Sequence, residues 1–260
     1  MKVNICILLV FAIGFLSCDD DDAQFTIDCL PTVLQDGVIS FHPFNAGALT
    51  DESGNQNDLT NTSTATSTSD RNGNANCAYV FDNSINADEF LTTTNTNFLN
   101  SLSTFSVSIW YQPIDSTRSG GDFEVLLSRN IDSHCPNRRG EWSVGLFDCR
   151  KAVFGHNNSV WMNNIPNVVG CQETVNFLTD KWHHLVAVKN NDEYKIYLNG
   201  NLEETATGNA GCTNSYLAQD IGDLFIGKFY TGKIDDVIIY NRALAQQDVV
   251  NLYQLAECCE

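Results

Sequence analysis

A loop rich in oxygen-bearing side chains lies near the start of the chain. Asp51, Asn55, Asn57 and Asp58 fall within one short segment, DESGNQND. Carboxylate and amide oxygens are the ligands that Ca²⁺ takes in proteins, although this segment lacks the glutamate at the twelfth position of an EF-hand loop. The alternative is an Asx-rich turn, in which these side chains accept hydrogen bonds from the backbone of their own loop. The loop residues alone leave both interpretations open.

A tryptophan surrounded by amides is the best candidate for ligand binding. Trp161 lies in the stretch HNNSVWMNN, residues 156–164, where we expect no strand alternation that would require a core residue. An indole ring suits stacking on a sugar, while His156, Asn157 and Asn163 would bind the sugar hydroxyls. The alternative is that Trp161 fills a gap beneath long loops, because large aromatic side chains bury most of their area. Further candidates for exposed aromatic side chains are Trp142, Tyr111 and Tyr230.

Catalytic motifs are missing from the sequence. It contains no Gly-x-Ser-x-Gly nucleophile elbow and no His-Glu-x-x-His zinc motif. His183 and His184 follow Trp182 at the start of a predicted strand, so alternation sends one ring inward and the other outward, as expected of structural histidines. We therefore predict a protein without catalytic residues and without enzymatic activity.

The chain contains 10 cysteines. Cys6 belongs to the apolar leader and Cys18 follows it, which leaves an even number for the rest of the chain. Zinc sites need closely spaced Cys-x-x-Cys or His-x-x-His pairs, and the sequence has none. We therefore predict disulfides and an oxidising compartment. The cysteines assigned to them are Cys29, Cys77, Cys135, Cys149, Cys171, Cys212, Cys258 and Cys259.

The first residues predict a secretory leader with a lipid attachment site. Residues 5–16 form an apolar run after Lys2, too short for the roughly 20 residues that span a bilayer. The run ends in FLSC, residues 15–18, which resembles the bacterial lipobox. This resemblance implies that residues 1–17 are a lipoprotein signal peptide and that Cys18 carries a covalent lipid. The alternative is ordinary signal cleavage, with Cys18 in a disulfide.

An acidic run follows the lipid site. The adjacent carboxylates of Asp19 to Asp22 repel one another and stay solvated, so we assign residues 18–36 to a lipidated acidic tether. A cysteine followed by acidic residues also resembles the surface-export signal of lipoproteins in the Bacteroidetes group. This resemblance implies a lipid-anchored protein of the outer membrane that faces the cell exterior.

The charge balance argues against nucleic acid as a partner. Asp and Glu number 32 against 14 Lys and Arg, so the formal net charge is -18. Such a surface repels phosphates, which argues against nucleic-acid binding. It also avoids anionic lipid headgroups, so we expect the lipid to be the only contact with the membrane.

From Gly37 onward, short apolar alternations are separated by clusters of Asn, Gly, Ser, Thr and Asp, a spacing that predicts an antiparallel all-β sandwich or barrel. Residues 105–111, FSVSIWY, alternate most clearly, with Phe105 and its alternate neighbours on one face and Trp110 on the other. We expect residues 155–180 to be irregular and only residues 243–253 to be helical. No repeat divides the chain, so residues 37–260 are predicted to form one domain.

Five segments in order carry a family resemblance. They are GNANCAYVFD (residues 73–82), FSVSIW (105–110), WHHLV (182–186), KIYLNG (195–200) and GKIDDVIIYNRAL (232–244). Together they resemble the laminin-G-like, concanavalin-A-like jelly roll, which implies two curved antiparallel sheets. Residues 115–180 depart from the compact family pattern. The fold is shared with glycoside hydrolases that use paired glutamates, but their strand signature Glu-x-Asp-x-(x)-Glu is absent here.

The resemblance also implies which distant segments meet. The first and last strands of such jelly rolls lie side by side, which would bring Cys29 near Cys258 or Cys259. Of the remaining cysteines, Cys135 would pair with Cys149, Cys171 with Cys212, and Cys77 with the other terminal cysteine. The same arrangement would bring the Asp51 loop to the last strand, where Asp51, Asn57 and Asp235 would share one structural Ca²⁺. Otherwise Asp235, expected on the core side with Val237, would accept backbone N–H groups.

Two functions fit these observations. The first is a non-catalytic surface lipoprotein that binds glycan through its jelly roll. The alternative is a protein-interaction module, either an accessory subunit of an outer-membrane transport or assembly complex or an adhesin.

Overall fold

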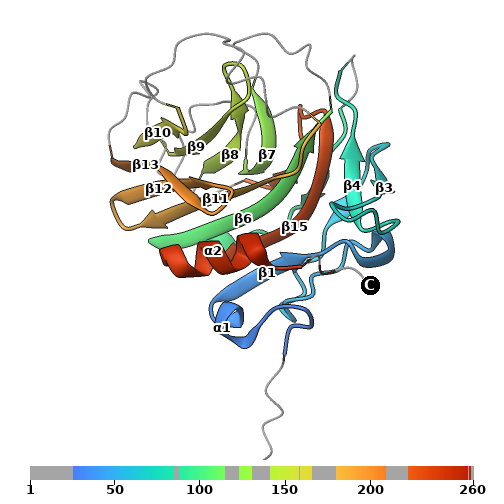
Figure 1. Ribbon diagram of the computed structural model, residues 1–260, viewed down its shortest axis with the longest axis horizontal. Helices are drawn as coiled ribbons and strands as arrows, with labels where there is room; N and C mark the ends of the chain where they lie inside the picture. Colours follow the sequence, from blue (N-terminus) through green and yellow to red (C-terminus); the bar gives the residue numbers. More distant parts are fainter. Residues whose placement is uncertain are drawn as a thin grey trace, which may run out of the picture.

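Two antiparallel sheets pack face to face in the part of the chain that the structure describes (Figure 1). This computed structural model describes residues 26–84, 88–114, 123–130, 141–157, 159–165, 180–208, 222–256 and 258. The predicted fold class, a two-sheet antiparallel β sandwich with one short C-terminal helix, is confirmed.

Sheet A runs in the order β13 (Asn201–Thr207), β12 (Glu193–Leu198), β11 (His183–Asn190), β6 (Thr104–Pro113), β15 (Gly232–Tyr240), β4 (Ala78–Phe81) and β3 (Thr66–Thr68), and β1 (Val38–His42) also pairs with β15. Sheet B runs in the order β10 (Val160–Asn163), β9 (Lys151–His156), β8 (Trp142–Phe147), β7 (Glu124–Arg129), β14 (Leu224–Ile226), β5 (Leu91–Thr93) and β2 (Thr60–Asn61). The helices are α1 (Thr32–Gln35) and α2 (Gln246–Gln254), with 3₁₀ turns at Asn45–Gly47 and Asn97–Leu99.

Strand alternation places the main core between the sheets. Val107 and Ile109 of β6 belong to the same buried cluster as Val144 and Phe154 of sheet B. Trp110, which follows Ile109 on the same strand, lies on the opposite face of sheet A, as the alternation predicts. The sandwich is therefore closed by apolar side chains that the sequence pattern identifies directly.

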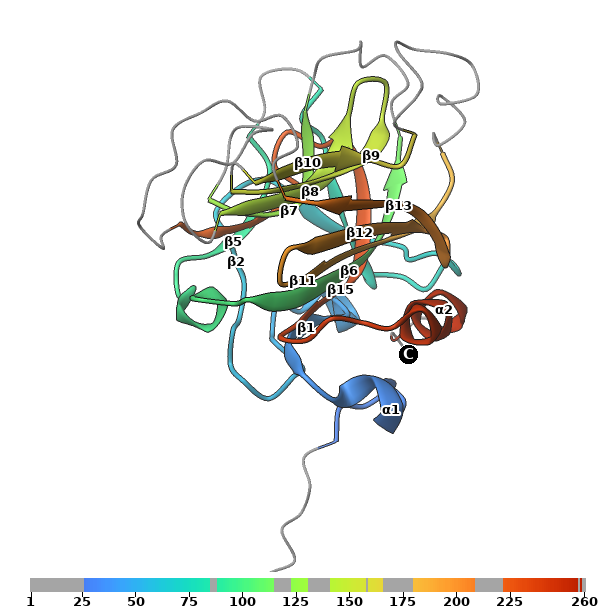
Figure 2. The same cartoon turned by 90° about the vertical axis from the view of Figure 1, so that its left-hand side faces the viewer.

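A second core covers the outer face of sheet A. Val186 and Ile238 of that face pack with Leu34 of α1 and with Val249 and Leu252 of α2. Figures 1 and 2 show both helices on the side of sheet A that faces away from sheet B. Sheet A is therefore covered on both faces.

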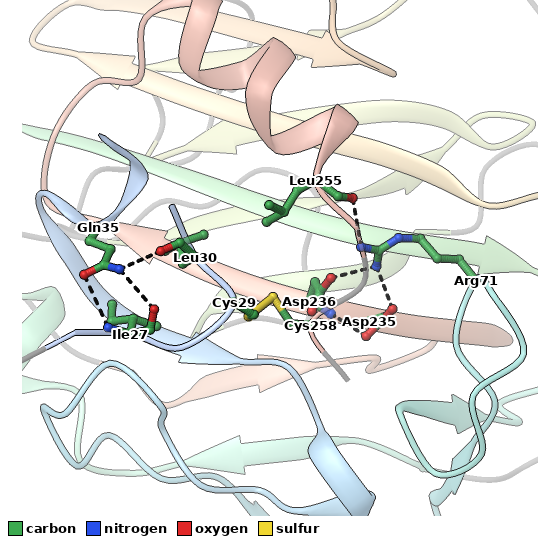
Figure 3. Close-up of a disulfide and its surroundings, with 9 residues drawn as sticks. All are labelled: Ile27, Cys29, Leu30, Gln35, Arg71, Asp235, Asp236, Leu255 and Cys258. Atoms are coloured by element: carbon green, nitrogen blue, oxygen red, sulfur yellow. Dashed lines mark hydrogen bonds and ion pairs between the residues drawn. A yellow bond between two sulfur atoms is a disulfide. The ribbon is translucent and has the colours of Figure 1, made fainter. Parts of the chain in front are cut away.

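The N-terminal segment is tied to the C-terminal segment. Cys29 and Cys258 form a disulfide, which confirms the expected neighbourhood of Cys29 and the terminal cysteines (Figure 3). Ile27 and Leu30 are buried in the second core, and the Nε2 atom of Gln35 donates hydrogen bonds to both of their carbonyls. Residues 26–36, which the sequence analysis assigned to the tether, therefore pack against the sandwich.

Cys77 and Cys149 are also disulfide-bonded. The rest of the predicted pairing, which involves Cys135, Cys171, Cys212 and Cys259, lies outside the described residues. The signal peptide, Cys18 and the acidic run also lie outside them. Among the described residues, no helix is long and apolar enough to cross a membrane.

The prediction of irregular structure after residue 155 is wrong for its first part. β9 continues to His156 and forms a hairpin with β10. The polar composition of residues 156–164 concealed this strand, because Val160 and Met162 are the apolar residues that the described part of this stretch contributes to the core. The hairpin is the element that positions Trp161.

Candidate functional site

The outer face of sheet B carries the tryptophan that the sequence analysis identified. Trp161 lies opposite Gly155 in the β9–β10 hairpin. Val160 and Met162 on either side of it are buried between the sheets. Successive side chains of a strand point to opposite faces, so the indole of Trp161 projects from the outer face.

Two phenylalanine rings hold this indole. The ring centroids of Phe123 and Phe147 lie 5.9 and 5.7 Å from that of Trp161, and the ring planes are inclined by 65° and 81°. Such edge-to-face contacts are favourable and restrict ring rotation. We call Phe123, Phe147 and Trp161 the aromatic cluster. All three side chains are half-buried, so the cluster offers a partly exposed apolar surface of fixed orientation.

A row of small side chains crosses sheet B from the aromatic cluster. The register places Trp161 opposite Gly155, Gly155 opposite Ser143, Ser143 opposite Ser128, and Ser128 opposite Phe225. We call these residues the cross-strand row. Side chains of directly paired residues point to the same face of a sheet. The row therefore has an aromatic ring at each end and only glycine and serine between them.

The far end of the row is also stabilised by aromatic contacts. The ring centroid of Phe225 lies 5.5 Å from that of Phe90. The Nζ atom of Lys228 lies 4.8 and 4.7 Å from these two centroids, a cation–π arrangement, and 3.7 Å from a carboxylate oxygen of Asp88. Phe225 is half-buried, as Trp161 is at the other end.

His156, predicted to bind ligand beside Trp161, faces the core. Its Nδ1 atom lies 3.1 Å from the hydroxyl of Tyr194, and its ring packs against Phe105. Burial lowers the pKa of His156 to about 3, and the positive charge of Lys189 adds to the shift, so the ring is neutral near pH 7. His156 and Trp161 therefore project from opposite faces of sheet B.

The two asparagines of the predicted set are placed differently. Asn157 lies in the β9–β10 turn with φ 48°, and its N–H donates to the carbonyl of Glu141 at 2.7 Å. Asn163 follows Trp161 by two residues on the same strand, and its Oδ1 accepts the N–H of Ile165 at 2.9 Å. Of the predicted ligand-binding residues, Asn163 thus shares the face of Trp161, whereas His156 lies in the core and Asn157 in the turn.

The other aromatic candidates are buried, so their predicted exposure is wrong. Trp142, Tyr111 and Tyr230 all belong to the core between the sheets. Sequence reasoning missed Phe147 and Ser143 instead. The signal for both was present in the strand WSVGLF, because the inward positions of Trp142 and its alternate neighbours leave serine, glycine and phenylalanine on the outer face.

The Asp51 loop has the hydrogen bonds of an Asx-rich turn. The Oδ1 atom of Asp51 accepts the N–H groups of Phe41 and Ser53 at 2.8 and 3.0 Å, and Oδ2 accepts that of Asn57 at 2.9 Å. The side chain of Asn57 donates to the carbonyl of Ile39 at 2.8 Å. Backbone donors thus supply the compensation that the sequence analysis sought from Ca²⁺. Calcium binding stays a prediction, which calorimetry with and without EDTA tests.

Asp235 lies on the outer face of sheet A, and its expected place on the core side with Val237 is wrong. A β-bulge between Asp235 and Ile238 shifts the register against β6, with Asp236 at φ 42°. The extra residue reverses the alternation, so that Asp235 lies opposite Trp110 while Val237 remains in the core.

An arginine compensates the charge of this aspartate pair (Figure 3). The Nη1 atom of Arg71 lies 2.8 Å from Asp235 and 2.7 Å from Asp236, and Nη2 donates to the carbonyl of Leu255. Its guanidinium also lies 4.6 Å from the ring centroid of Trp110. Burial and the charge of Asp236 raise the pKa of Asp235, while Arg71 lowers it. Among the described residues, no group of three His, Cys, Asp or Glu side chains could hold a metal.

Comparison with known proteins identifies the family. The family described as "Concanavalin A-like lectin/glucanases superfamily" matches residues 82–250. The chain belongs to this superfamily. It contains both lectins and glucanases, so membership by itself leaves open whether a member is catalytic. No curated protein matches the chain.

Solved structures with the same fold include carbohydrate- and protein-bound domains. Domain 4 of AbnA, a GH43 extracellular arabinanase from Geobacillus stearothermophilus, in complex with arabinotriose, is 18% identical with a TM-score of 0.58, covering 84% of this chain and 98% of that one. The binding domain of Botulinum neurotoxin DC in complex with SialylT is 16% identical with a TM-score of 0.59. The same domain in complex with rat synaptotagmin II is 17% identical with a TM-score of 0.61. Both toxin matches cover 85% of this chain and 52% of the toxin chain, so the chain spans about half of their length.

Proposed function

We propose that this protein is a non-catalytic glycan-binding domain whose ligand lies on the outer face of sheet B. The observation that carries the proposal is Trp161, which projects from β10 and is fixed by Phe123 and Phe147. An oriented, partly exposed indole is a platform on which a sugar ring stacks. Asn163 on the same face adds an amide within reach of sugar hydroxyls.

The similar folds support a binding role. The arabinanase domain is solved with arabinotriose, and the toxin binding domain with SialylT. Each of these structures shows one domain of a larger protein together with a bound ligand. The buried Glu124 of this chain accepts two hydrogen bonds from Arg150, at 2.9 and 3.1 Å, so its carboxylate is held in an ion pair. These observations support a binding protein in place of a glycosidase.

We further propose that the domain is displayed by a lipid on Cys18 at the outer membrane, facing the cell exterior. The support is the lipobox-like FLSC and the acidic run that follows it. A multiply acylated cysteine exceeds the two-chain requirement for stable anchoring. The variant Cys18→Ala is expected to leave the membrane fraction or to remain unprocessed. Unchanged attachment and electrophoretic mobility would contradict the anchor, and unchanged protease accessibility after replacement of Asp19–Asp22 by alanine would contradict the export role of the acidic run.

The binding proposal is tested on a glycan panel. The purified protein should retain at least one glycan, and Trp161→Ala should weaken that binding about tenfold or more, which corresponds to about 1.4 kcal/mol. Tyr253→Ala is the matched control, because Tyr253 is 39% exposed and lies on α2, on the far side of sheet A. Equal losses in both variants, or none in either, would contradict a site at Trp161.

A protein partner is the second candidate. The toxin binding domain with rat synaptotagmin II has this fold and a protein partner. Val33 and Leu202, exposed apolar side chains, provide contact surface away from the outer face of sheet B. An accessory role in an outer-membrane complex, or adhesion, predicts that a defined membrane protein co-purifies with the chain and is lost in Leu202→Asp but not in Trp161→Ala.

A further inference from the structure

The first described residues form a segment that is hydrogen-bonded only to itself. We call residues 26–35 the N-terminal flap. The side-chain amide of Gln35 donates to the carbonyls of Ile27 and Leu30 and accepts the N–H of Ile27 (Figure 3). Among the described residues, no hydrogen bond joins the flap to the rest of the chain. Moving the flap away from the sandwich therefore breaks no hydrogen bond between described residues.

The chain becomes fixed to sheet A directly after the flap. The carbonyl of Asp36 accepts a hydrogen bond from Nε of Arg242 at 2.7 Å, and that of Gly37 accepts the N–H of Asn241 at 2.8 Å. The pairing of β1 with β15 then begins at Val38. The end of the flap is therefore a natural hinge, because the self-contained segment meets the fixed strand there.

Two kinds of contact hold the flap closed. Ile27, Leu30 and Leu34 are buried in the second core, and a disulfide joins Cys29 to Cys258. Hollows of about 140 and 300 Å³ border the flap, the first beside the disulfide and the second beside α1. Ordering the flap costs conformational entropy that offsets much of the gain from its three apolar side chains. The disulfide is therefore the contact that decides whether the flap stays closed.

This disulfide is open to a small reductant. Cys29 is exposed, and both of its cysteines line the smaller hollow. Cys77 and Cys149, which are also disulfide-bonded, are each only 3% exposed. Thiol–disulfide exchange depends on access to a sulfur atom, and exposed disulfides are the labile ones in proteins. A mild reductant should therefore reach Cys29 before it reaches Cys77 or Cys149.

Carboxylates in the same hollow select among reductants. Asp28 and Glu52 line it together with Cys29. Their negative charges repel a thiol with a net negative charge, such as glutathione, but do not repel an uncharged or cationic thiol. A small uncharged or cationic thiol is therefore the class of reductant that fits this site.

We propose that the Cys29–Cys258 disulfide is a redox switch: a small uncharged or cationic thiol reduces it, and the N-terminal flap then separates from the second core while the sandwich stays folded. Opening exposes the apolar side chains of the flap. It also moves the junction between the N-terminal tether and the domain from Cys29 to the end of the flap. The switch is separate from the proposed glycan-binding function, and a failure of either leaves the other standing.

The reduction proceeds by two exchange steps. A small thiolate attacks Sγ of Cys29, the S–S bond breaks, and Cys258 leaves as a thiolate. A second small thiolate attacks the mixed disulfide on Cys29, which releases a small-molecule disulfide and the Cys29 thiolate. Each cysteine thiolate takes up the proton that one small thiol lost. Two electrons thus pass from two small thiols to the protein.

The first test measures the order of reduction. The oxidised protein is treated with cysteamine or 2-mercaptoethanol, trapped with iodoacetamide at intervals and mapped by mass spectrometry. Cys29 and Cys258 should become alkylated about tenfold or more faster than Cys77 and Cys149. Equal rates for the two groups of cysteines overturn the proposal.

The second test concerns the class of reductant. Asp28→Asn/Glu52→Gln should raise the rate of reduction by glutathione relative to that by 2-mercaptoethanol. Glu203→Gln/Glu204→Gln is the matched control, because it removes the same charge from β13, and β12, β11 and β6 lie between that strand and β15. The control should keep the wild-type ratio of rates. An equal change in both variants overturns the role of the hollow.

The third test uses chymotrypsin to report the position of the flap. Leu34 in the flap and Leu185 in the main core are both 0% exposed. After mild reduction, cleavage after Leu34 should become about tenfold faster or more, because opening exposes this bond, while cleavage after Leu185 stays unchanged. Reoxidation should restore protection. Cys29→Ser/Cys258→Ser should be cut after Leu34 without any reductant.

Two results of the third test contradict the switch. Protection of Leu34 after complete reduction of Cys29–Cys258 would mean that the apolar contacts alone keep the flap closed. Faster cleavage at both Leu34 and Leu185 would mean that the disulfide holds the whole fold together and controls no separate segment.

Discussion

At the scale of single residues, buried charges in this protein have specific partners. Arg71 contacts Asp235 and Asp236 and stacks on Trp110. Removing one member of a buried ionic group leaves the others uncompensated, which costs about 3–5 kcal/mol. We therefore expect Arg71→Ala to lower the free energy of unfolding by about this amount in urea denaturation.

The control for this variant is Arg242→Ala. Arg242 pairs with Asp248 at 2.7 Å, but its side chain is more exposed than that of Arg71. Partly exposed pairs contribute about 1 kcal/mol or less. Similar losses in the two variants would show that the Asp235–Asp236 pair does not depend on its arginine.

Buried histidines predict the response to acid. Burial lowers the pKa of His42 to about 4 and that of His184 to about 3, although Asp51 partly opposes the shift at His42. In the unfolded chain these rings take up protons below about pH 6.5, while in the folded protein they stay neutral. Stability is therefore complete above that pH and is lost as the pH falls toward the folded pKa values.

His184→Gln tests this response. The glutamine can still contact the hydroxyl of Ser108, which lies 2.8 Å from Nε2 of His184, but it cannot take up a proton. Between pH 6.5 and 5, we expect the variant to take up about one proton fewer on unfolding. An unchanged slope of unfolding free energy against pH would show that His184 is already protonated in the folded state.

At the scale of elements, regular strands were predicted correctly from the sequence, whereas a bulge was not. Clean alternation made β6 predictable, since every second residue from Phe105 enters the core. The strand β15 was recognised, but its bulge at Asp236 was not, because one inserted residue has no signature in a period-2 pattern. The strand that carries Trp161 was missed for a different reason. It is short, and two of its side chains, Val160 and Met162, belong to the core, which is too few to show an alternating pattern.

The β12–β13 turn offers a test at this scale. Gly200 has φ +81°, and a Cβ atom there would lie 3.1 Å from the ring of Tyr253 on α2. Gly73 has φ +92° but nothing within 4 Å. Both Gly→Ala variants carry the backbone strain of a left-handed conformation, about 1 kcal/mol. Gly200→Ala should lose more stability than Gly73→Ala, and equal losses would indicate that α2 does not pack against this turn in solution.

At the scale of the whole molecule, one covalent bond joins the ends of the folded unit. The Cys29–Cys258 disulfide links residues separated by 229 positions. Closing so long a loop restricts the unfolded chain and contributes about 3–5 kcal/mol. Cys29→Ser/Cys258→Ser should lose this amount in urea denaturation. An unchanged free energy of unfolding would mean that the α1 segment and the C-terminal residues stay docked without the bond.

The fold and the end-to-end pairing could be predicted because they depend on patterns repeated along the chain. Alternation predicted the sandwich. In the family that the chain resembles, the first and last strands lie side by side, and this predicted a C-terminal cysteine as the partner of Cys29. The site could not be predicted to the same extent. The cross-strand row joins residues from five strands, and their alignment depends on register, which single segments of sequence do not contain.

The central claim is that the outer face of sheet B binds glycan, and a crystal structure of the protein with a retained oligosaccharide tests it most directly. We predict a sugar ring stacked on the indole of Trp161, with sugar hydroxyls within hydrogen-bond distance of the Asn163 side chain. An oligosaccharide bound elsewhere, with the aromatic cluster unchanged from the unliganded protein, would contradict this account.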